Sequence, residues 1–127
     1  MSTVDYLRTE EVLRLVAPDA IGSAIEVRDF GLLHAAVNRP RATVFGQDAY
    51  PDLWTKAAAL LHSIALNYPL VDGNKRLAWH TSVVFLALNG ADIAVDDDTA
   101  YDFVISVASG DLNDVEKIAE RLRAFAS

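Results

Sequence analysis

Six consecutive residues, from Val71 to Arg76, combine a carboxylate, a glycine, an amide and two cations. A long apolar run begins directly after them at Leu77, so this polar segment lies where a helix should begin. The first N–H groups of a helix have no acceptor within the helix and carry the positive end of its dipole, so they attract phosphate. Lys75 and Arg76 add two full positive charges there, and Asp72 suits a magnesium ion, which usually takes only one or two protein carboxylates. The segment therefore predicts a site for a phosphate group and a metal ion.

Composition restricts the class of protein that can carry this site. The chain has 127 residues, 52% of them hydrophobic, so we expect one domain, residues 1–127, with a core that needs no disulfide or metal. It has no cysteine, which excludes thiol chemistry, and its net charge of −7 argues against direct binding of nucleic acid or an anionic membrane. No apolar stretch approaches the roughly 18 residues that span a bilayer, and the start of the chain lacks the basic and apolar regions of a signal peptide. We expect a soluble, cytoplasmic protein.

The helical spacing of apolar residues runs through almost the whole chain and predicts an all-α fold. The run from Val83 to Leu88 is apolar on all sides, which predicts that its helix lies at the centre of a bundle. Polar caps, prolines and glycines mark where each helix begins or ends. The six expected helices begin at or near Thr9, Asp29, Asp52, Asn74, Asp96 and Asp114, and the first four end near Pro18, Pro40, Pro69 and Gly90.

Two stretches depart from the helical pattern. Ile25 to Val27 is short and β-branched, which is typical of a strand fragment or an extended linker. Residues 39–50 contain Thr43-Val44-Phe45 followed by Gly46-Gln47-Asp48, which resembles one arm of a small hairpin and its turn. A loop of about a dozen residues in a compact helical domain is more often functional than idle, so we interpret residues 39–50 as a flap.

The residues from Asn67 to Arg76 closely resemble the signature of the Fic/Doc superfamily in its Doc, or death-on-curing, form, which reads His-x-Phe-x-Asp-x-Asn-Lys-Arg. Doc-type sequence also occurs at several places outside this segment, so the resemblance covers nearly the whole chain. These places are Tyr6-Leu7, Arg28 to Leu33, Arg39-Pro40, Phe45-Gly46, Ala49 to Leu53 and Ala108 to Gly110. The resemblance implies an all-α Fic fold of about six helices, in which a motif loop, residues 68–76, joins two central helices.

The resemblance also implies an activity and a set of partners. A chain of this type is a toxin, a kinase that uses ATP and Mg²⁺ to phosphorylate a hydroxyl of a protein similar to elongation factor Tu and thereby blocks translation. Its partner is an antitoxin of the Phd type, whose C-terminal helix we expect in the groove between the motif loop and the flap. The same groove is expected to admit the protein substrate.

A role for each polar residue of the motif loop follows from the resemblance. Asp72 holds the metal ion or orients the acceptor hydroxyl, Gly73 lets the backbone approach the phosphates, and Asn74 donates to them. Lys75 and Arg76 neutralise phosphate charge, with arginine offering a two-point fork where lysine is a point charge. Phosphoryl transfer depends mainly on such positioning and charge neutralisation. Lys75 also argues against the alternative of AMP transfer, because the adenylylating Fic enzymes usually have glycine at that position.

The motif departs from the family at its first position, where Tyr68 replaces the histidine, and at Leu70, which replaces phenylalanine. Leucine keeps an apolar anchor, but the histidine of the family takes the proton from the target's hydroxyl. A phenol ionises only near pH 10, and loss of a general base typically costs about 10²–10⁴-fold in rate. We therefore predict a chain that binds nucleotide but is catalytically crippled, either an inactivated variant or a natural pseudoenzyme. The alternative from another class is a non-catalytic module that binds antitoxin or repressor.

The three histidines of the chain are not expected to replace the missing base. His62 and His80 are predicted to be packing or surface residues, and His34 has no partner that the sequence reveals. Trp79 follows Lys75 by one helical turn, so it is expected in the core or at the wall of the pocket.

Overall fold

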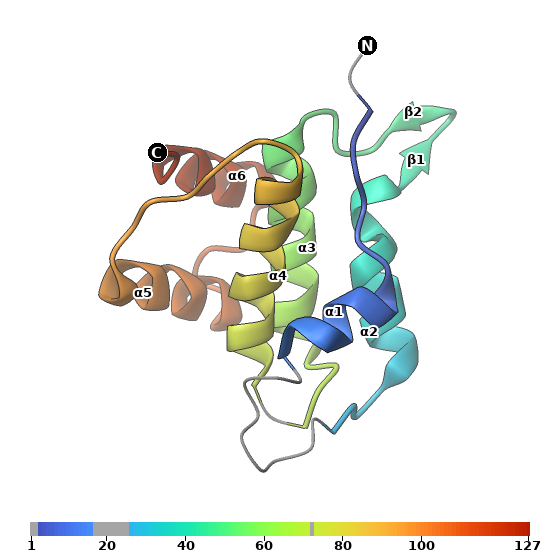
Figure 1. Ribbon diagram of the computed structural model, residues 1–127, viewed down its shortest axis with the longest axis horizontal. Coiled ribbons are helices and arrows are strands. Elements are labelled where there is room, and N and C mark those ends of the chain that lie inside the picture. The colour runs from blue at the N-terminus through green and yellow to red at the C-terminus, as the bar shows by residue number, and fades with distance from the viewer. Residues whose placement is uncertain (1–2, 17–25, 72) are drawn as a thin grey trace.

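The computed structural model describes residues 3–16, 26–71 and 73–127, and within them it confirms a mostly α-helical fold with one small hairpin (Figure 1). The helices are α1 (Thr9–Val16), α2 (Phe30–Asn38), α3 (Leu53–Asn67), α4 (Asn74–Leu88), α5 (Asp97–Ala108) and α6 (Val115–Ala124). A 3₁₀ turn, η2 (Arg39–Arg41), and the strands β1 (Thr43–Val44) and β2 (Gln47–Asp48) connect α2 to α3.

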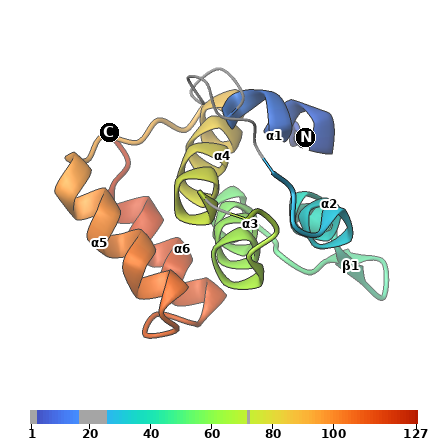
Figure 2. The ribbon, with the colours of Figure 1, turned by 90° about the horizontal axis from the view of Figure 1, so that it is seen from below.

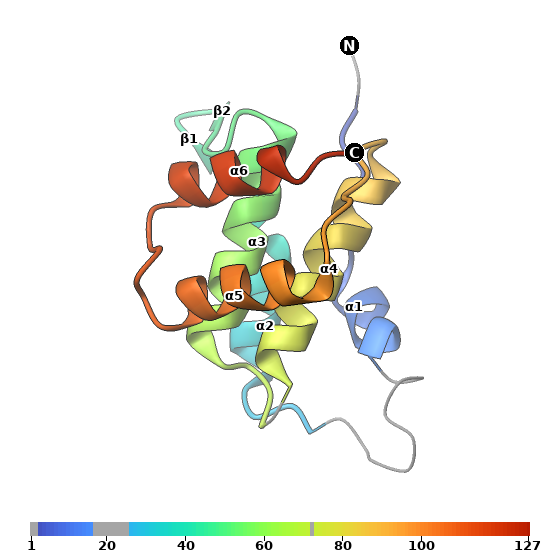
Figure 3. The same cartoon turned by 90° about the vertical axis from the view of Figure 1, so that its left-hand side faces the viewer.

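The helices form a bundle around one antiparallel pair. α3 and α4 lie side by side at the centre, and the motif loop connects them at one end of the bundle (Figure 1). α5 and α6 cover one side of this pair, and α1 and α2 cover the other (Figures 2 and 3). The arrangement places the first turn of α4 beside α5, which becomes important for the site.

Aspartates at helix starts act as caps, as the sequence predicts. In each case the aspartate is extended and its side chain accepts an N–H from the first turn; the four are Asp29, Asp52, Asp96 and Asp114. At α3 the arrangement is reciprocal, because Thr55 Oγ1 accepts from the Asp52 N–H in a capping box. At α5 the hydroxyl and then the N–H of Thr99 donate to Asp96 and hold the pKa of that carboxyl below its ordinary value.

The start of α1 differs from the prediction, because Thr9 is the first residue of the helix and not its cap. The backbone N–H of Arg8 donates to Glu11 Oε1 (2.9 Å). This bond, with a second from Arg8 Nε (3.3 Å), holds the pKa of the Glu11 carboxyl below its ordinary value. Thr9 is buried, and its Oγ1 lies 2.8 Å from His34 Nδ1. Thr9 therefore ties α1 to α2 and gives His34 a partner.

The most enclosed helix is α3, not the apolar second half of α4. From Thr55 to Ala65 every residue of α3 except His62 is buried. In α4, by contrast, Leu88 is 51% exposed. The prediction that α4 lies at the centre of the bundle is confirmed, but the last two residues of its apolar run, Ala87 and Leu88, are exposed. Three consecutive alanines, residues 57–59, let neighbouring helices approach α3 closely, and the size of the side chains at a contact sets how near two helices can pack.

The predicted hairpin is present within the flap. Thr43 pairs with Asp48, and the turn consists of Phe45 and Gly46, so it lies slightly earlier than the predicted turn over Gly46 to Asp48. Both turn residues have left-handed φ, 51° and 76°, as two-residue hairpins prefer. The side chain of Phe45 is fully exposed at the tip.

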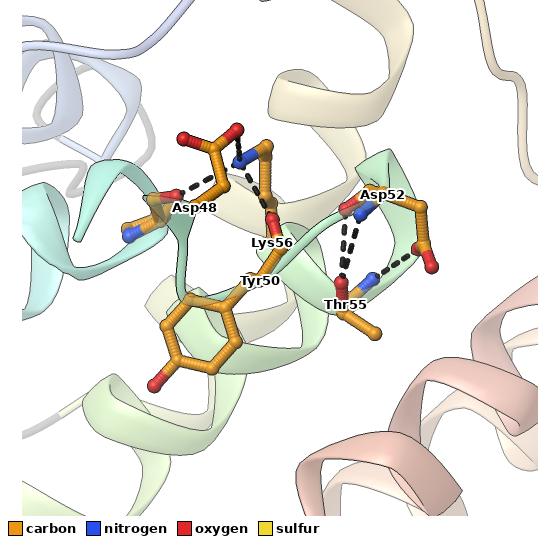
Figure 4. Close-up of polar contacts among 6 residues, drawn as sticks. Asp48, Tyr50, Asp52, Thr55 and Lys56 are labelled. Atoms are coloured by element: carbon orange, nitrogen blue, oxygen red, sulfur yellow. Dashed lines mark hydrogen bonds and ion pairs between the residues drawn. The ribbon is translucent and has the colours of Figure 1, made fainter. Parts of the chain in front are cut away.

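A buried lysine fixes the base of this hairpin to α3 (Figure 4). Lys56 is only 2% exposed, and its ammonium donates to Tyr50 O (2.7 Å), Asp48 Oδ2 (3.1 Å) and Pro40 O (3.4 Å). These three oxygens satisfy the three N–H bonds of an ammonium. Pro40 precedes the hairpin, whereas Asp48 and Tyr50 belong to its returning strand and exit, so Lys56 clips both stems together.

The hairpin and the motif loop lie at opposite ends of α3 (Figure 1). β2 leads into the N-terminus of this helix, and Tyr68 follows its C-terminus. The 15 residues of α3, at about 1.5 Å each, separate the two segments by about 22 Å. The prediction that they line one groove is therefore wrong, because the chain runs the full length of a straight helix between them.

Candidate phosphate-binding site

A cleft of about 710 Å³ opens beside the start of α4. The motif loop and the first two turns of α4 form one side, and α5 forms the other. Its polar part is lined by Tyr68, Gly73, Asn74, Lys75, Arg76 and His80, and the rest of its wall by Val71, Trp79, Asp97, Ala100, Tyr101 and Val104. One end is thus rich in cations and helix N–H groups, and the wall toward α5 is largely apolar and aromatic.

The structure brings together all the predicted site residues that it describes: Tyr68, Gly73, Asn74, Lys75 and Arg76 line this one cleft. Asp72, the predicted metal ligand, lies outside the described residues. In the parts of the chain that are described, no group of three or more His, Cys, Asp or Glu is arranged to hold a metal ion.

The two cations lie in the first turn of α4. Gly73 immediately precedes this helix with φ 86°, a conformation that glycine adopts without strain. Lys75 and Arg76 follow within three residues, and both side chains are exposed. Across residues 3–16, 26–71 and 73–127 neither forms an ion pair. Their charges add to the positive end of the helix dipole, so the start of α4 can attract an anion.

Asn74 has a structural role that the sequence did not indicate. Its Oδ1 accepts from the N–H of Leu70 (2.8 Å), and its Nδ2 donates to the carbonyl of the same residue (2.9 Å). The side chain therefore closes the motif loop onto the start of α4. A carboxamide has a second N–H, and this group and the backbone N–H of Asn74 can donate to a phosphate.

Tyr68 occupies the turn at the end of α3. Its backbone is left-handed (φ 49°, ψ 57°), and its side chain is 48% exposed at the cleft. Arg28 donates from Nε to Tyr68 O (2.7 Å) and from Nη2 to Asn67 O (2.8 Å). Sequence reasoning missed Arg28, since it lies 40 residues from Tyr68 and only the folded chain brings them together.

The wall contributed by α5 was also missed. Asp97, Ala100, Tyr101 and Val104 come more than 20 residues after the motif loop, and their helical spacing indicates only an amphipathic helix. Trp79 was expected either in the core or at the wall of the pocket, and it lines the cleft. Its ring packs edge-on against Phe103, with 6.2 Å between the ring centres.

The histidines divide between the cleft and the rest of the bundle. His80 is exposed and lines the cleft. His62 is not among the lining residues; its Nδ1 lies 2.9 Å from an Arg39 nitrogen and its Nε2 lies 2.9 Å from Asn113 Oδ1. Arginine can only donate, so Nδ1 of His62 is the acceptor and Nε2 the donor in this arrangement. His62 therefore links η2 to the segment between α5 and α6.

The chain is similar to known proteins both in its family pattern and along nearly its whole length. A sequence model described as the Fic/DOC family matches residues 6–86. The chain is also similar to a protein named Toxin Doc from Mycolicibacterium smegmatis (strain ATCC 700084 / mc(2)155), with 51% identity over 125 residues. The aligned residues cover 97% of this chain and 95% of that relative. Among the described helices, none is long and apolar enough to cross a bilayer.

Proposed function

This chain belongs to the Fic/DOC family, and from this premise we propose that it is the toxin of a toxin–antitoxin system. The name of its relative, Toxin Doc, supports that role. The finer proposal is that the cleft is built to transfer the γ-phosphate of ATP to a hydroxyl of a translation factor similar to elongation factor Tu, in the cytoplasm. In this chain Tyr68 leaves the site with nucleotide binding and little turnover.

One observation carries the proposal: a single cleft contains Tyr68, at the position of the family's proton acceptor, together with Lys75 and Arg76. Phosphoryl transfer requires a group that takes the acceptor's proton and positive charges that stabilise the transferred phosphoryl group. Tyr68, Lys75 and Arg76 line the same space, which supports the proposal. Lys75 favours γ-phosphate transfer over AMP transfer, since the adenylylating members of the family usually have glycine there.

The size and chemistry of the cleft support a nucleoside triphosphate as ligand. Its 710 Å³ lies within the roughly 300–1,000 Å³ that is usual for small-molecule sites. The cations and the start of α4 can hold the phosphates, and Trp79, Tyr101 and Val104 offer apolar surface to a base. ATP supplies the phosphoryl group, and the accompanying Mg²⁺ would be held by Asp72 of the motif; Asp97 lines the cleft and offers another carboxylate.

Tyr68 is the residue that limits turnover. A phenol is protonated at neutral pH, so it cannot take a proton from a serine or threonine hydroxyl. An imidazole is substantially neutral at cytosolic pH and can accept that proton. Three other polar residues that line the cleft, Asn74, Lys75 and Arg76, match the Doc motif. Restoring the histidine should therefore restore activity without any other change.

The test measures the transfer of label from ATP to a translation factor that is similar to elongation factor Tu. The parent protein and the Tyr68→His variant are each incubated with ATP labelled at the γ- or at the α-phosphate. We expect γ-label on the elongation factor with Tyr68→His and little with the parent. Transfer of α-label would identify an AMP transferase, and no transfer by folded Tyr68→His protein would favour a non-catalytic module that binds antitoxin.

The antitoxin is proposed to be of the Phd type and to bind in the same cleft through a C-terminal helix. At the rim Val71 and Tyr101 are 60% and 63% exposed, close to the exposed charges of Lys75 and Arg76. An amphipathic helix with acidic residues would complement this surface, and a disordered tail can fold as it binds. The hairpin at the other end of α3 is too far away to contribute to this contact.

Such a helix should bind the parent and Tyr68→His alike, since the exchange adds little charge at neutral pH. A pull-down with the product of the neighbouring gene tests this. Recovery of only the histidine form would contradict this position of the antitoxin helix, since it would show that binding depends on the exchange at residue 68.

A further inference from the structure

We propose that Arg28 is a positioning residue, which holds the end of α3 and the motif loop in the shape that directs the side chain of residue 68 into the cleft. The inference concerns the loop itself. Only its consequence for catalysis rests on the proposed function.

The backbone at Tyr68 is strained in two ways. Its φ of 49° lies in the left-handed region, which residues other than glycine seldom adopt. It also precedes Pro69, and a proline pushes the residue before it toward extended conformations. Such a conformation persists only where the surrounding structure determines it, so the contacts that hold this turn have to be identified.

Arg28 supplies contacts to three consecutive carbonyl oxygens of the turn. Its guanidinium donates to Asn67 O (2.8 Å) and Tyr68 O (2.7 Å), and its own backbone N–H donates to Pro69 O (2.8 Å). The last carbonyls of a helix have no partner within the helix and carry the negative end of its dipole. A planar guanidinium satisfies two of them in fixed directions, which a lysine ammonium would not do.

The neighbours of Arg28 extend this clamp on both sides. The N–H of Asp29 also donates to Pro69 O (3.0 Å), and the N–H of Val71 donates to Glu26 O (3.0 Å). Val27 and Leu70 form an antiparallel bridge between these contacts. Asp29 in turn caps α2, so the short segment from Glu26 to Asp29 ties the motif loop to a second helix.

Leu70, in the same loop, is held from the opposite direction by the side chain of Asn74. The turn is thus held between Arg28 on one side and the start of α4 on the other. Without the guanidinium, the strain at Tyr68 favours relaxation toward an extended backbone. Such a change would turn the side chain of residue 68 away from Lys75 and Arg76. Arg28 is exposed, so its loss should loosen the loop more than it destabilises the fold.

The first experiment measures amide hydrogen exchange by NMR in the parent and in Arg28→Gln. We expect the amides of residues 28, 29 and 71 to exchange about tenfold faster or more in the variant, whereas those in the middle of α3 keep their protection. Arg121→Gln, which removes the same charge from an exposed position on α6, is the matched control and should change none of them. Parental exchange at residues 28, 29 and 71 in Arg28→Gln would overturn the inference.

Arg28→Lys keeps the experiment decisive if Arg28→Gln unfolds. This variant retains the positive charge but loses the fork. We expect it to loosen the same three amides without affecting α3. If it exchanges like the parent, a charge alone is sufficient, and the claim that the two directed guanidinium bonds hold the loop is refuted.

A second arm places Arg28→Gln in the Tyr68→His background and measures phosphoryl transfer. A misplaced base should lower kcat by about 10- to 100-fold while KM for ATP stays within about twofold. An unchanged kcat, or a fall that affects only KM, would refute the positioning role in catalysis. If Tyr68→His transfers no phosphate at all, the proposed function fails, and the exchange measurements still decide whether Arg28 holds the loop.

Discussion

Replacing Lys56 with methionine removes the clip at the base of the hairpin while keeping a side chain of similar length. β1 and β2 contain two residues each, and an isolated two-stranded hairpin is at best marginally stable in water. Residues 43–48 are all exposed. The position of the hairpin therefore depends on its stems, where the Lys56 ammonium contacts Pro40 O, Asp48 Oδ2 and Tyr50 O.

The cost of this substitution can be divided among the three oxygens. The Asp48 side chain is 52% exposed, so water can replace its partner, and such pairs are worth about 0–1 kcal/mol. Tyr50 O accepts at 2.7 Å in a partly buried position, and a carbonyl that loses its partner there costs up to about 1–3 kcal/mol. Pro40 O, at 3.4 Å, is at the outer limit of a hydrogen bond and adds little. Lys56→Met should therefore lower the free energy of unfolding by about 2 kcal/mol.

Urea denaturation followed by circular dichroism measures this difference, provided that the slope of the transition is unchanged. Asp48→Asn should cost less than about 1 kcal/mol, since it removes only the half-exposed partner. Lys117→Met, at an exposed lysine of α6, is the matched control and should stay within about 0.5 kcal/mol of the parent.

Two results would refute this reasoning. If Lys56→Met lowers the free energy of unfolding as little as the Lys117→Met control does, the hydrogen bonds of the buried ammonium make no net contribution to stability. A cost for Asp48→Asn equal to that of Lys56→Met would show that the ion pair, and not the backbone carbonyls, holds the hairpin.

Three further predictions concern the site and its supporting helix. Arg76→Ala should weaken ATP binding by about 1.5–3 kcal/mol in calorimetry, and unchanged affinity would remove Arg76 from the phosphate site. Induced Tyr68→His should arrest bacterial growth and protein synthesis where the parent does not, and adding Asp72→Ala should restore growth; normal growth with folded Tyr68→His would contradict the lost-base interpretation. Thr99 lowers the pKa of Asp96, so the stabilisation from the ionised carboxylate is present above the ordinary value of 3.8 and is lost as pH falls through the lower folded pKa. When the pH is lowered, the free energy of unfolding should therefore fall less in Asp96→Asn than in the parent. Urea denaturation at several pH values measures this fall, and an equal fall in both proteins would contradict the prediction.

The sequence predicts most of the fold because its helix boundaries are set by local chemistry. An aspartate cap acts within its own first turn, so Asp29, Asp52, Asp96 and Asp114 can be identified without knowledge of the tertiary structure. The motif loop is equally local, since Gly73, Lys75 and Arg76 are contiguous with the helix whose start they form.

The features that the sequence did not reveal depend on contacts between distant segments. Lys56 lies among apolar residues of α3, but lysine is rarely buried, and its acceptors come from both stems of the hairpin, at Pro40, Asp48 and Tyr50. Arg28 meets the end of α3, and α5 closes the cleft, only after the chain has folded. The predicted groove between flap and motif loop is wrong because the sequence does not show that the 15-residue helix α3 holds these two segments at opposite ends.

The turn at residue 68 is held through backbone carbonyls, which every amino acid provides, and its side chain is about half exposed. Exchange of histidine and tyrosine there should consequently be almost neutral for folding. Under the proposed function, a population of cells could silence this toxin by one codon change without producing a misfolded protein that proteases remove. The silenced form would persist in the cell and occupy antitoxin, so that any active copy encoded elsewhere would meet less of its inhibitor.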